Sequence, residues 1–393
     1  MGSEATPRTT LAARPLSLAI GGLAALAAAM GVGRFVYTPI LPFMIDDLGL
    51  TKGQAGFIGS ANFAGYLVGA LLATAPILPG SRRTWMLGAL AASAVTTAAT
   101  GLLSSMTAFL VLRFLGGVAS AFVLVFASTL VLERLRTMGH ARLAALHFGG
   151  VGVGIALSAL LVSGLAMWGG GWRSQWLVGG LVSLAAVLLA ARLIPEQIEP
   201  PPATGGGERS RRLLTLVTAY GLFGFGYVIT ATFLVAIVRE SEEIRSLEPV
   251  IWFVVGATAA PSVALWTWVS SKAGVLRTFA IACTVEAIGV AASVLWISPS
   301  GVVLAAALLG GTFMGITALG LVGARELSPN APRRVFALMT AAFGLGQTIG
   351  PGFAGALHDR TGEFLSSSLT ATCALLVAAM LAMGIVARKD ATQ

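Results

Sequence analysis

The chain has 393 residues, of which 56% are hydrophobic and 10% charged, with a formal net charge of +9 at pH 7. A soluble protein of this length needs about 25% charged residues to wet its surface, so the composition excludes a water-soluble globule and predicts an all-α membrane protein. The basic residues stand singly or in pairs between apolar runs, which excludes a nucleic-acid-binding face and suits membrane-topology signals.

Twelve apolar stretches approach the roughly 20 residues that a helix needs to cross a bilayer. We place them at about 16–43, 54–78, 84–102, 107–132, 143–166, 175–193, 213–238, 249–271, 276–297, 301–324, 334–357 and 364–387. Only Ser298-Pro299-Ser300 separates the ninth from the tenth. The first stretch also resembles a secretory signal, because Arg14 precedes LSLAIGGLAALAAA. We favour a span, since the apolar run continues to Met44.

A polar segment rich in proline, glycine and charge divides six spans from six. We therefore expect an N-terminal bundle at 1–194, a cytoplasmic linker at 195–212 and a C-terminal bundle at 213–393. The halves also repeat each other in sequence. GVGRFVY from position 31 matches GLFGFGY from position 221, Leu115 matches Leu309, and Arg142 matches Arg334, at separations of 190, 194 and 192 residues. Duplicated six-helix halves are typical of secondary transporters.

The basic residues between spans predict the orientation of the chain. With the N-terminus in the cytoplasm, eighteen Arg and Lys residues lie on the cytoplasmic side and five on the other. The positive-inside rule therefore predicts a cytoplasmic-membrane protein with both termini in the cytoplasm.

Three motifs resemble those of a known family. Arg113-Phe-Leu-Gly-Gly117 resembles the R-x-x-x-G motif of the major facilitator superfamily, and GQTIGPGFAG at 346–355 is similar to its antiporter-type motif. GVGRFVYTPILP at 31–42 and GFGYVITATF at 224–233 resemble the signature of the YbfB/YjiJ branch. The resemblance implies a monomeric alternating-access transporter whose cavity is lined by the first, fourth, seventh and tenth helices.

One loop departs from the superfamily pattern. The loop after the second span usually carries G-x-x-x-D-R-x-G-R-R, but here only Gly80, Arg82 and Arg83 remain and the acid is missing. We therefore expect the cytoplasmic gate to depend on other contacts.

Two arginines lie far from the ends of predicted spans, and an arginine at the bilayer centre costs about 2.5–3.5 kcal/mol. Arg34 and Arg113 lie at comparable depth, roughly 9–14 Å below the outer surface. A guanidinium matches a carboxylate bidentately, so we expect both arginines to bind an anionic substrate. The alternative is that each binds carbonyl and hydroxyl groups within the helix bundle. Arg113 is also a candidate for proton coupling.

The remaining proton-coupling candidates are Glu286 and His147. Glu286 is a carboxylate within the ninth span, where burial disfavours the charged form, although the peripheral place that the resemblance gives this helix favours a structural role as a protonated or paired carboxyl group. His147 can titrate near neutral pH, but Met339 takes its place in the repeat, which favours packing.

Other polar and helix-breaking residues complete the candidate set. Tyr37, Tyr227 and Gln347 are candidate substrate-binding groups, with aromatic packing and interhelical hydrogen bonding as the alternatives; the latter also applies to Asn62. The candidates for gating or helix kinking are Pro39, Pro42, Gly117, Gly350 and Pro351.

The sequence therefore predicts a secondary transporter that moves a small solute, with an organic anion favoured and H⁺ as the coupling ion. Efflux of drugs or metabolites is the main alternative. A membrane-embedded enzyme or a sensor is disfavoured, because the loops are short. The sequence holds no P-loop, no H-E-x-x-H and no cysteine–histidine cluster, and we expect neither cofactor nor metal.

Overall fold

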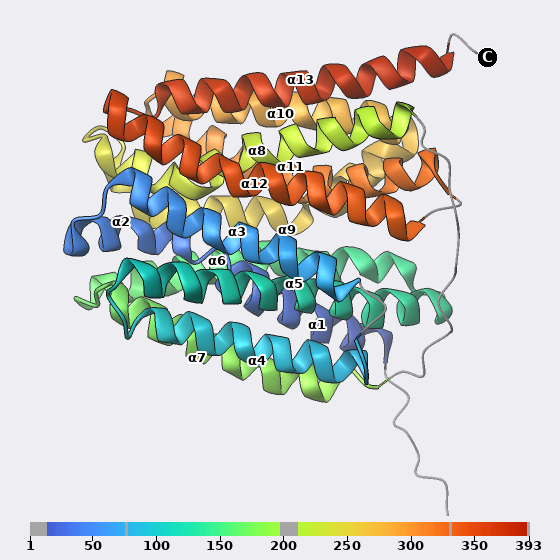
Figure 1. The fold of residues 1–393 in the computed structure, drawn as a ribbon, viewed down its shortest axis with the longest axis horizontal. Coiled ribbons are helices and arrows are strands. Elements are labelled where there is room, and N and C mark those ends of the chain that lie inside the picture. The colour runs from blue at the N-terminus through green and yellow to red at the C-terminus, as the bar shows by residue number, and fades with distance from the viewer. Residues whose placement is uncertain (1–13, 75–77, 197–210, 330–331, 391–393) are drawn as a thin grey trace, which may run out of the picture.

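The computed structural model describes residues 14–74, 78–196, 211–329 and 332–390, and its described regular elements are all helical. The helices run side by side along one common direction (Figure 1). The N-terminal elements are α1 Pro15–Leu26, η1 Ala27–Val32, α2 Tyr37–Leu48, α3 Lys52–Ala73, α4 Arg82–Thr100, α5 Met106–Thr137, η2 Ala141–Leu143, α6 Ala144–Met167 and α7 Trp172–Leu193. The C-terminal elements are α8 Arg211–Glu240, η3 Arg245–Leu247, α9 Glu248–Ala273, α10 Val275–Leu295, α11 Pro299–Leu327, α12 Pro332–Thr361 and α13 Leu365–Asp390.

These elements form the predicted all-α membrane fold. Within the described chain, ten helical segments are long and apolar enough to span a membrane, with Pro15–Leu48 counted as one segment. The other two long helices, α4 and α12, are the least apolar on average and pack along the others. The predicted boundary between the ninth and tenth spans is confirmed, because α10 ends at Leu295 and α11 begins at Pro299. Ser298 caps α11 by accepting a hydrogen bond from the Gly301 amide.

The helices form two groups, which Figure 1 shows one above the other. In the N-terminal group α5 packs on α3 and α4, and α6 on α1 and η1; in the C-terminal group α11 packs on α9 and α10, and α8 on α12 and α13. The groups meet where α3 packs on α12, α6 on α9 and α2 on α8. The predicted linker, 195–212, lies largely outside the described residues, which include only 195–196 and 211–212 of it.

Close backbone approach sets the α6–α9 contact. A Cβ atom on Gly152 would lie 2.6 Å from the Cα atom of Ala260, which is closer than real Cβ contacts. Small residues at this crossing allow two helices to touch through their backbones, as is common inside membranes. We call the end of the bundle that holds Pro15 and Asp390 the terminal end, and the opposite end, at 48–52, 240–248 and 361–365, the distal end.

Candidate substrate site

The site begins at a break in the first span that the sequence did not predict. The α-helix ends at Leu26, six residues form a π-helix, and a turn over 33–36 leads into α2. Within this break the Gly33 amide donates to the Ala28 carbonyl at 2.7 Å, and the Phe35 amide donates to the Met30 carbonyl at 3.1 Å. Both bonds reach back five residues, which is the wider π spacing that often marks functional sites. Gly31 permits the break to lie directly on the backbone of α6 at Gly154.

Arg34 projects from this break into the interface between the two groups of helices. Its side chain is 3% exposed, and its Nη2 donates to Oε1 of Gln347 on α12 at 2.9 Å. Gln347 in turn donates from Nε2 to the hydroxyl of Tyr227 on α8. The structure thus brings together three of the five predicted substrate-binding residues, from the N-terminal and the C-terminal groups.

Aromatic rings surround this polar chain. The guanidinium carbon of Arg34 lies 4.4 Å from the ring centre of Phe63 and 4.2 Å from that of Tyr66, both on α3. Rings hold a cation through their negative faces but do not neutralise it. Among the described residues Arg34 has no ion-pair partner, and its Nε has no hydrogen-bond acceptor. Arg34 is therefore a buried cation with donor capacity to spare.

On the other side of Gln347 the rings of the C-terminal group form a stack. Tyr227 lies parallel to Phe313 at 5.6 Å and to Phe343 at 5.8 Å between ring centres. Phe35 meets Phe313 edge-on at 5.9 Å, which joins the two groups through aromatic contacts. Sequence reasoning missed Phe63, Tyr66, Phe313 and Phe343. The only available signal was the i, i+3 spacing of Phe63 and Tyr66, beside Asn62.

Arg113 lies behind the site rather than in it. Its Nη1 donates to the Gly33 carbonyl at 3.0 Å and its Nη2 to the Arg34 carbonyl at 2.9 Å. Asn62 donates from Nδ2 to the carbonyl of Arg113 at 2.8 Å, which ties α3 to α5. These contacts match the alternative we gave for Arg113, in which the side chain binds carbonyls of the bundle. The guanidinium therefore donates hydrogen bonds to the two carbonyl groups that the helix break leaves without helical partners.

Tyr37 also points away from the Arg34 cluster. Its hydroxyl donates to the Ala55 carbonyl at 2.7 Å, and its ring lies 6.3 Å from that of Trp176. Although Tyr37 and Tyr227 occupy equivalent places in the sequence repeat, only Tyr227 contacts Gln347. The pseudo-symmetry of the sequence therefore does not extend to the contacts of these two side chains.

The two other proton-coupling candidates are buried and lie outside the hydrogen-bonded chain of Arg34, Gln347 and Tyr227. Glu286 on α10 has no exposed surface, and neither carboxyl oxygen has a hydrogen-bond partner in the described chain. His147 on α6 lies with Nε2 3.1 Å from the Ser128 hydroxyl of α5, while Nδ1 faces Gly22 of α1. Within the described residues, no hydrogen bond or ion pair joins Glu286 or His147 to Arg34, Gln347 or Tyr227.

The candidate gating residues lie at helix contacts. Pro39 and Pro42 are in α2, just past the break, and Pro351 is inside α12. A Cβ atom on Gly117 would meet the backbone of Asn62, and one on Gly350 would lie 2.5 Å from a methyl group of Val228. Both glycines thus hold neighbouring helices close together.

At the terminal end, Arg83 shows what the incomplete loop motif does in this chain. Its Nε donates to the Ile194 carbonyl at 2.7 Å and its Nη2 to the Ala191 carbonyl at 2.5 Å. The guanidinium therefore caps the last turn of α7, where a positive charge is favoured by the helix dipole.

The sequence matches the family described as "Uncharacterised MFS-type transporter YbfB" over residues 26–383. It is 26% identical over 359 residues to the uncharacterized MFS-type transporter YceJ of Bacillus subtilis (strain 168), covering 85% of this chain and 88% of that one. A chloramphenicol resistance protein of Streptomyces lividans is 27% identical over 233 residues, 57% of this chain and 59% of the relative. A gallate transporter of Pseudomonas putida is 30% identical over 157 residues, 40% of this chain and 35% of the relative. This chain therefore spans less than two thirds of the length of the last two relatives.

A solved structure shares the fold. The crystal structure of the nucleoside transporter NupG superposes with a TM-score of 0.69 over 95% of this chain and 98% of that chain, at 15% sequence identity. A mutant form of the same transporter superposes with a TM-score of 0.73.

Proposed function

The chain belongs to the YbfB family of MFS-type transporters, and we propose that it moves a small organic anion across the cytoplasmic membrane by alternating access, coupled to protons and as a monomer. The family is one of MFS-type transporters, and the gallate relative is named as a transporter of a small solute rather than as an enzyme. The anionic substrate, the coupling to protons and the alternating-access mechanism are our proposals beyond the family membership.

The environment of Arg34 is what supports an anionic substrate. It is a buried cation at the interface of the two groups, it has no ion-pair partner in the described chain, and its Nε lacks an acceptor. Burying a charge at membrane depth is costly unless a partner neutralises it. A carboxylate that displaces Gln347 would accept two hydrogen bonds from the guanidinium fork and supply that partner.

The aromatic surroundings favour a carboxylate carried on a ring. Phe63 and Tyr66 flank the guanidinium, and the stack of Phe313, Tyr227 and Phe343 lies beyond Gln347. Flat rings pack well against such faces. The relative named as a gallate transporter supports this class, because gallate is a benzoate with three hydroxyl groups.

Binding at Arg34 would be coupled to the movement of the two halves. The bond from Arg34 to Gln347 joins α12 to the first span, so an anion that takes its place changes a contact between residues 1–194 and residues 213–393. A ligand can shift a conformational equilibrium only through such differential contacts. On this proposal the segment 195–212 links two rocking bundles on the cytoplasmic side, which is also the terminal end. Pro39, Pro42, Gly117, Gly350 and Pro351 would take part in the movement.

Proton coupling is assigned to Glu286, with His147 and Arg113 as the other candidates. Glu286 is supported by its burial and by its two oxygens without partners in the described chain, a state that a neutral carboxyl group tolerates better than a carboxylate.

The experiment is flux of radiolabelled gallate and benzoate into proteoliposomes with and without an inward proton gradient. We expect accumulation of at least one of them when the gradient is present, and its loss in Arg34→Ala with normal protein insertion. Absence of flux and of binding for every carboxylate tested would reject the anion.

The second candidate is drug efflux, which the match to a chloramphenicol resistance protein supports. It predicts lower drug sensitivity in cells that overproduce the protein, and no dependence of that effect on Arg34.

A further inference from the structure

The distal end carries a set of charged contacts between the two groups of helices. Lys52, the first residue of α3, places Nζ 2.6 Å from Oε1 of Glu240, the last residue of α8. Arg239 places Nη1 2.8 Å from Oδ2 of Asp46 on α2. The Gly53 amide at the start of α3 donates to Oδ2 of Asp359 on α12 at 3.0 Å. Each contact joins a residue before 195 to a residue after 212.

Arg239 has a second partner inside its own group. Its Nε and Nη2 donate to Oε2 and Oε1 of Glu248 on α9 at 2.8 and 2.6 Å, a bidentate pair. The Glu248 side chain is 15% exposed and that of Asp46 is 67% exposed. Bidentate, sheltered pairs are the strong ones, whereas exposed pairs contribute little. Arg239 is therefore held to the C-terminal group and joined loosely to the N-terminal group.

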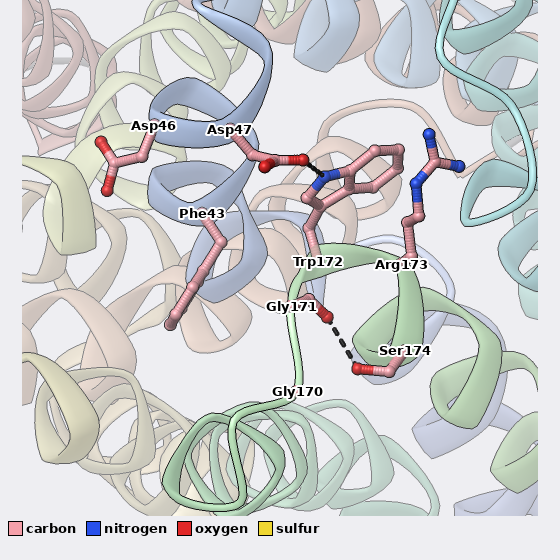
Figure 2. A pocket seen from close by; sticks show the side chains of 8 residues that line it. All are labelled: Phe43, Asp46, Asp47, Gly170, Gly171, Trp172, Arg173 and Ser174. Carbon is pink, nitrogen blue, oxygen red and sulfur yellow. Dashed lines mark hydrogen bonds between the residues drawn. The ribbon is translucent and has the colours of Figure 1, made fainter.

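Asp46 and the next residue, Asp47, turn to different sides of α2. Figure 2 shows Asp47 directed at Trp172, and both residues line a pocket of about 640 Å³; the Trp172 Nε1 donates to Asp47 at 2.6 Å. That bond ties α2 to α7 within the N-terminal group. Two adjacent acids thus serve different interfaces, which provides a matched pair for mutation.

Beneath the charges, the helix backbones are in close contact. A Cβ atom on Gly355 of α12 would meet the backbone of Lys52, and the Gly352 amide donates to the Ser60 hydroxyl of α3 at 3.0 Å. The distal end of the α3–α12 interface is therefore closed by backbone packing, and the ion pairs lie over it.

We infer that Lys52–Glu240 and Asp46–Arg239 are the two clasps of a distal gate, which break when the transporter opens to that side. The inference rests on the proposed alternating access. Each pair is at least partly exposed, so each clasp stabilises the distally closed state only weakly. Removal of one clasp raises the distally open population by up to about fivefold. On opening, Arg239 stays with Glu248 and Asp46 moves away.

The test follows the access of a reagent to Ser60, which is 8% exposed in this closed state. Ser60→Cys is made with Cys283→Ala and Cys373→Ala, and a membrane-impermeant maleimide is applied to intact cells, whose outer surface is the distal side on the proposed orientation. We expect Lys52→Gln and Asp46→Asn each to raise the labelling rate severalfold. Asp47→Asn, the matched control, leaves the rate at the parental value.

A charge exchange separates a clasp from general loosening. Lys52→Glu alone raises labelling, and the double variant Lys52→Glu with Glu240→Lys lowers it again, because the pair is restored with opposite sign. Parental labelling rates in both Lys52→Gln and Asp46→Asn, or equal increases in Asp46→Asn and Asp47→Asn, overturn the gate. Labelling needs no substrate. Faster labelling in the Lys52 and Asp46 variants, together with no flux of any carboxylate, would therefore support the gate and reject only the proposed anionic substrate.

Discussion

Arg113 donates from Nη2 to the backbone carbonyl of Arg34 at 2.9 Å, so one buried arginine holds the main chain of the other. Its Nη1 holds the preceding carbonyl, that of Gly33, at 3.0 Å. The two bonds fill the gap that the break in the first span leaves in the helical hydrogen-bond ladder. They set the direction in which the Arg34 side chain leaves the backbone.

Arg113→Lys tests this positioning role. The charge is kept, but a single ammonium group lacks the planar fork that serves both carbonyls, so we expect a loss of about 1.5–3 kcal/mol of stability. Thermal unfolding of the purified protein in detergent measures it. Arg173→Lys is the control, since Arg173 is exposed and donates to a single carbonyl, that of Gly101. Equal effects of the two changes would contradict the role.

Arg34→Lys and Arg34→Gln test the anion site. The lysine variant keeps a charge without the fork and should bind benzoate at least about tenfold more weakly, a loss of about 1.4 kcal/mol or more. The glutamine variant should lose binding. Isothermal titration with benzoate, and with benzamide as the neutral analogue, measures both. Unchanged benzoate affinity in the two variants removes Arg34 from the site.

Tyr227→Phe tests the polar chain through Gln347. The change removes the hydroxyl that accepts from Gln347 but keeps the ring between Phe313 and Phe343. A buried donor that loses its acceptor costs about 1–3 kcal/mol, which we expect as lower thermal stability without ligand. Tyr37→Phe should have an effect of similar size on stability but none on benzoate affinity, because its hydroxyl contacts Ala55 instead.

Glu286→Gln tests proton coupling. The amide cannot exchange a proton, so gradient-driven accumulation should fall while exchange of labelled for unlabelled substrate continues. Flux into proteoliposomes with and without a pH gradient separates the two. Accumulation that still follows the gradient would leave Glu286 a structural residue and direct attention to His147.

Gly152→Ala tests the contact between the two groups at α6 and α9. The added methyl group would overlap the backbone at Ala260, and overpacking of this kind costs about 1–3 kcal/mol. Gly164→Ala is the matched control on the same helix, because no atom lies within 4 Å of its added methyl group. We expect thermal stability to fall in the first variant and to stay level or rise in the second.

Patterns along the chain are enough to predict that the protein lies in a lipid bilayer and how its helices are arranged in order. Apolar runs of spanning length, a polar segment after six of them and a repeat near 190 residues are local or one-dimensional patterns. They need no knowledge of contacts, because a helix in lipid satisfies its own backbone and only its length and hydropathy matter. Arg34 was also identifiable from sequence, since a charge within a span is conspicuous wherever it points.

The contacts of the candidate residues, by contrast, depend on packing between segments far apart in the chain. Arg34 and Gln347 are separated by 313 positions, and their meeting depends on how the two groups of helices pack together. Packing within the N-terminal group places Arg113 on main-chain carbonyls, and tertiary contacts give Tyr37 and Tyr227 different partners, although these two tyrosines occupy equivalent places in the sequence repeat. The break at 27–36 was hidden because alanine-rich sequence favours an unbroken helix, and it is held by contacts with α5 and α6 that local propensity does not contain.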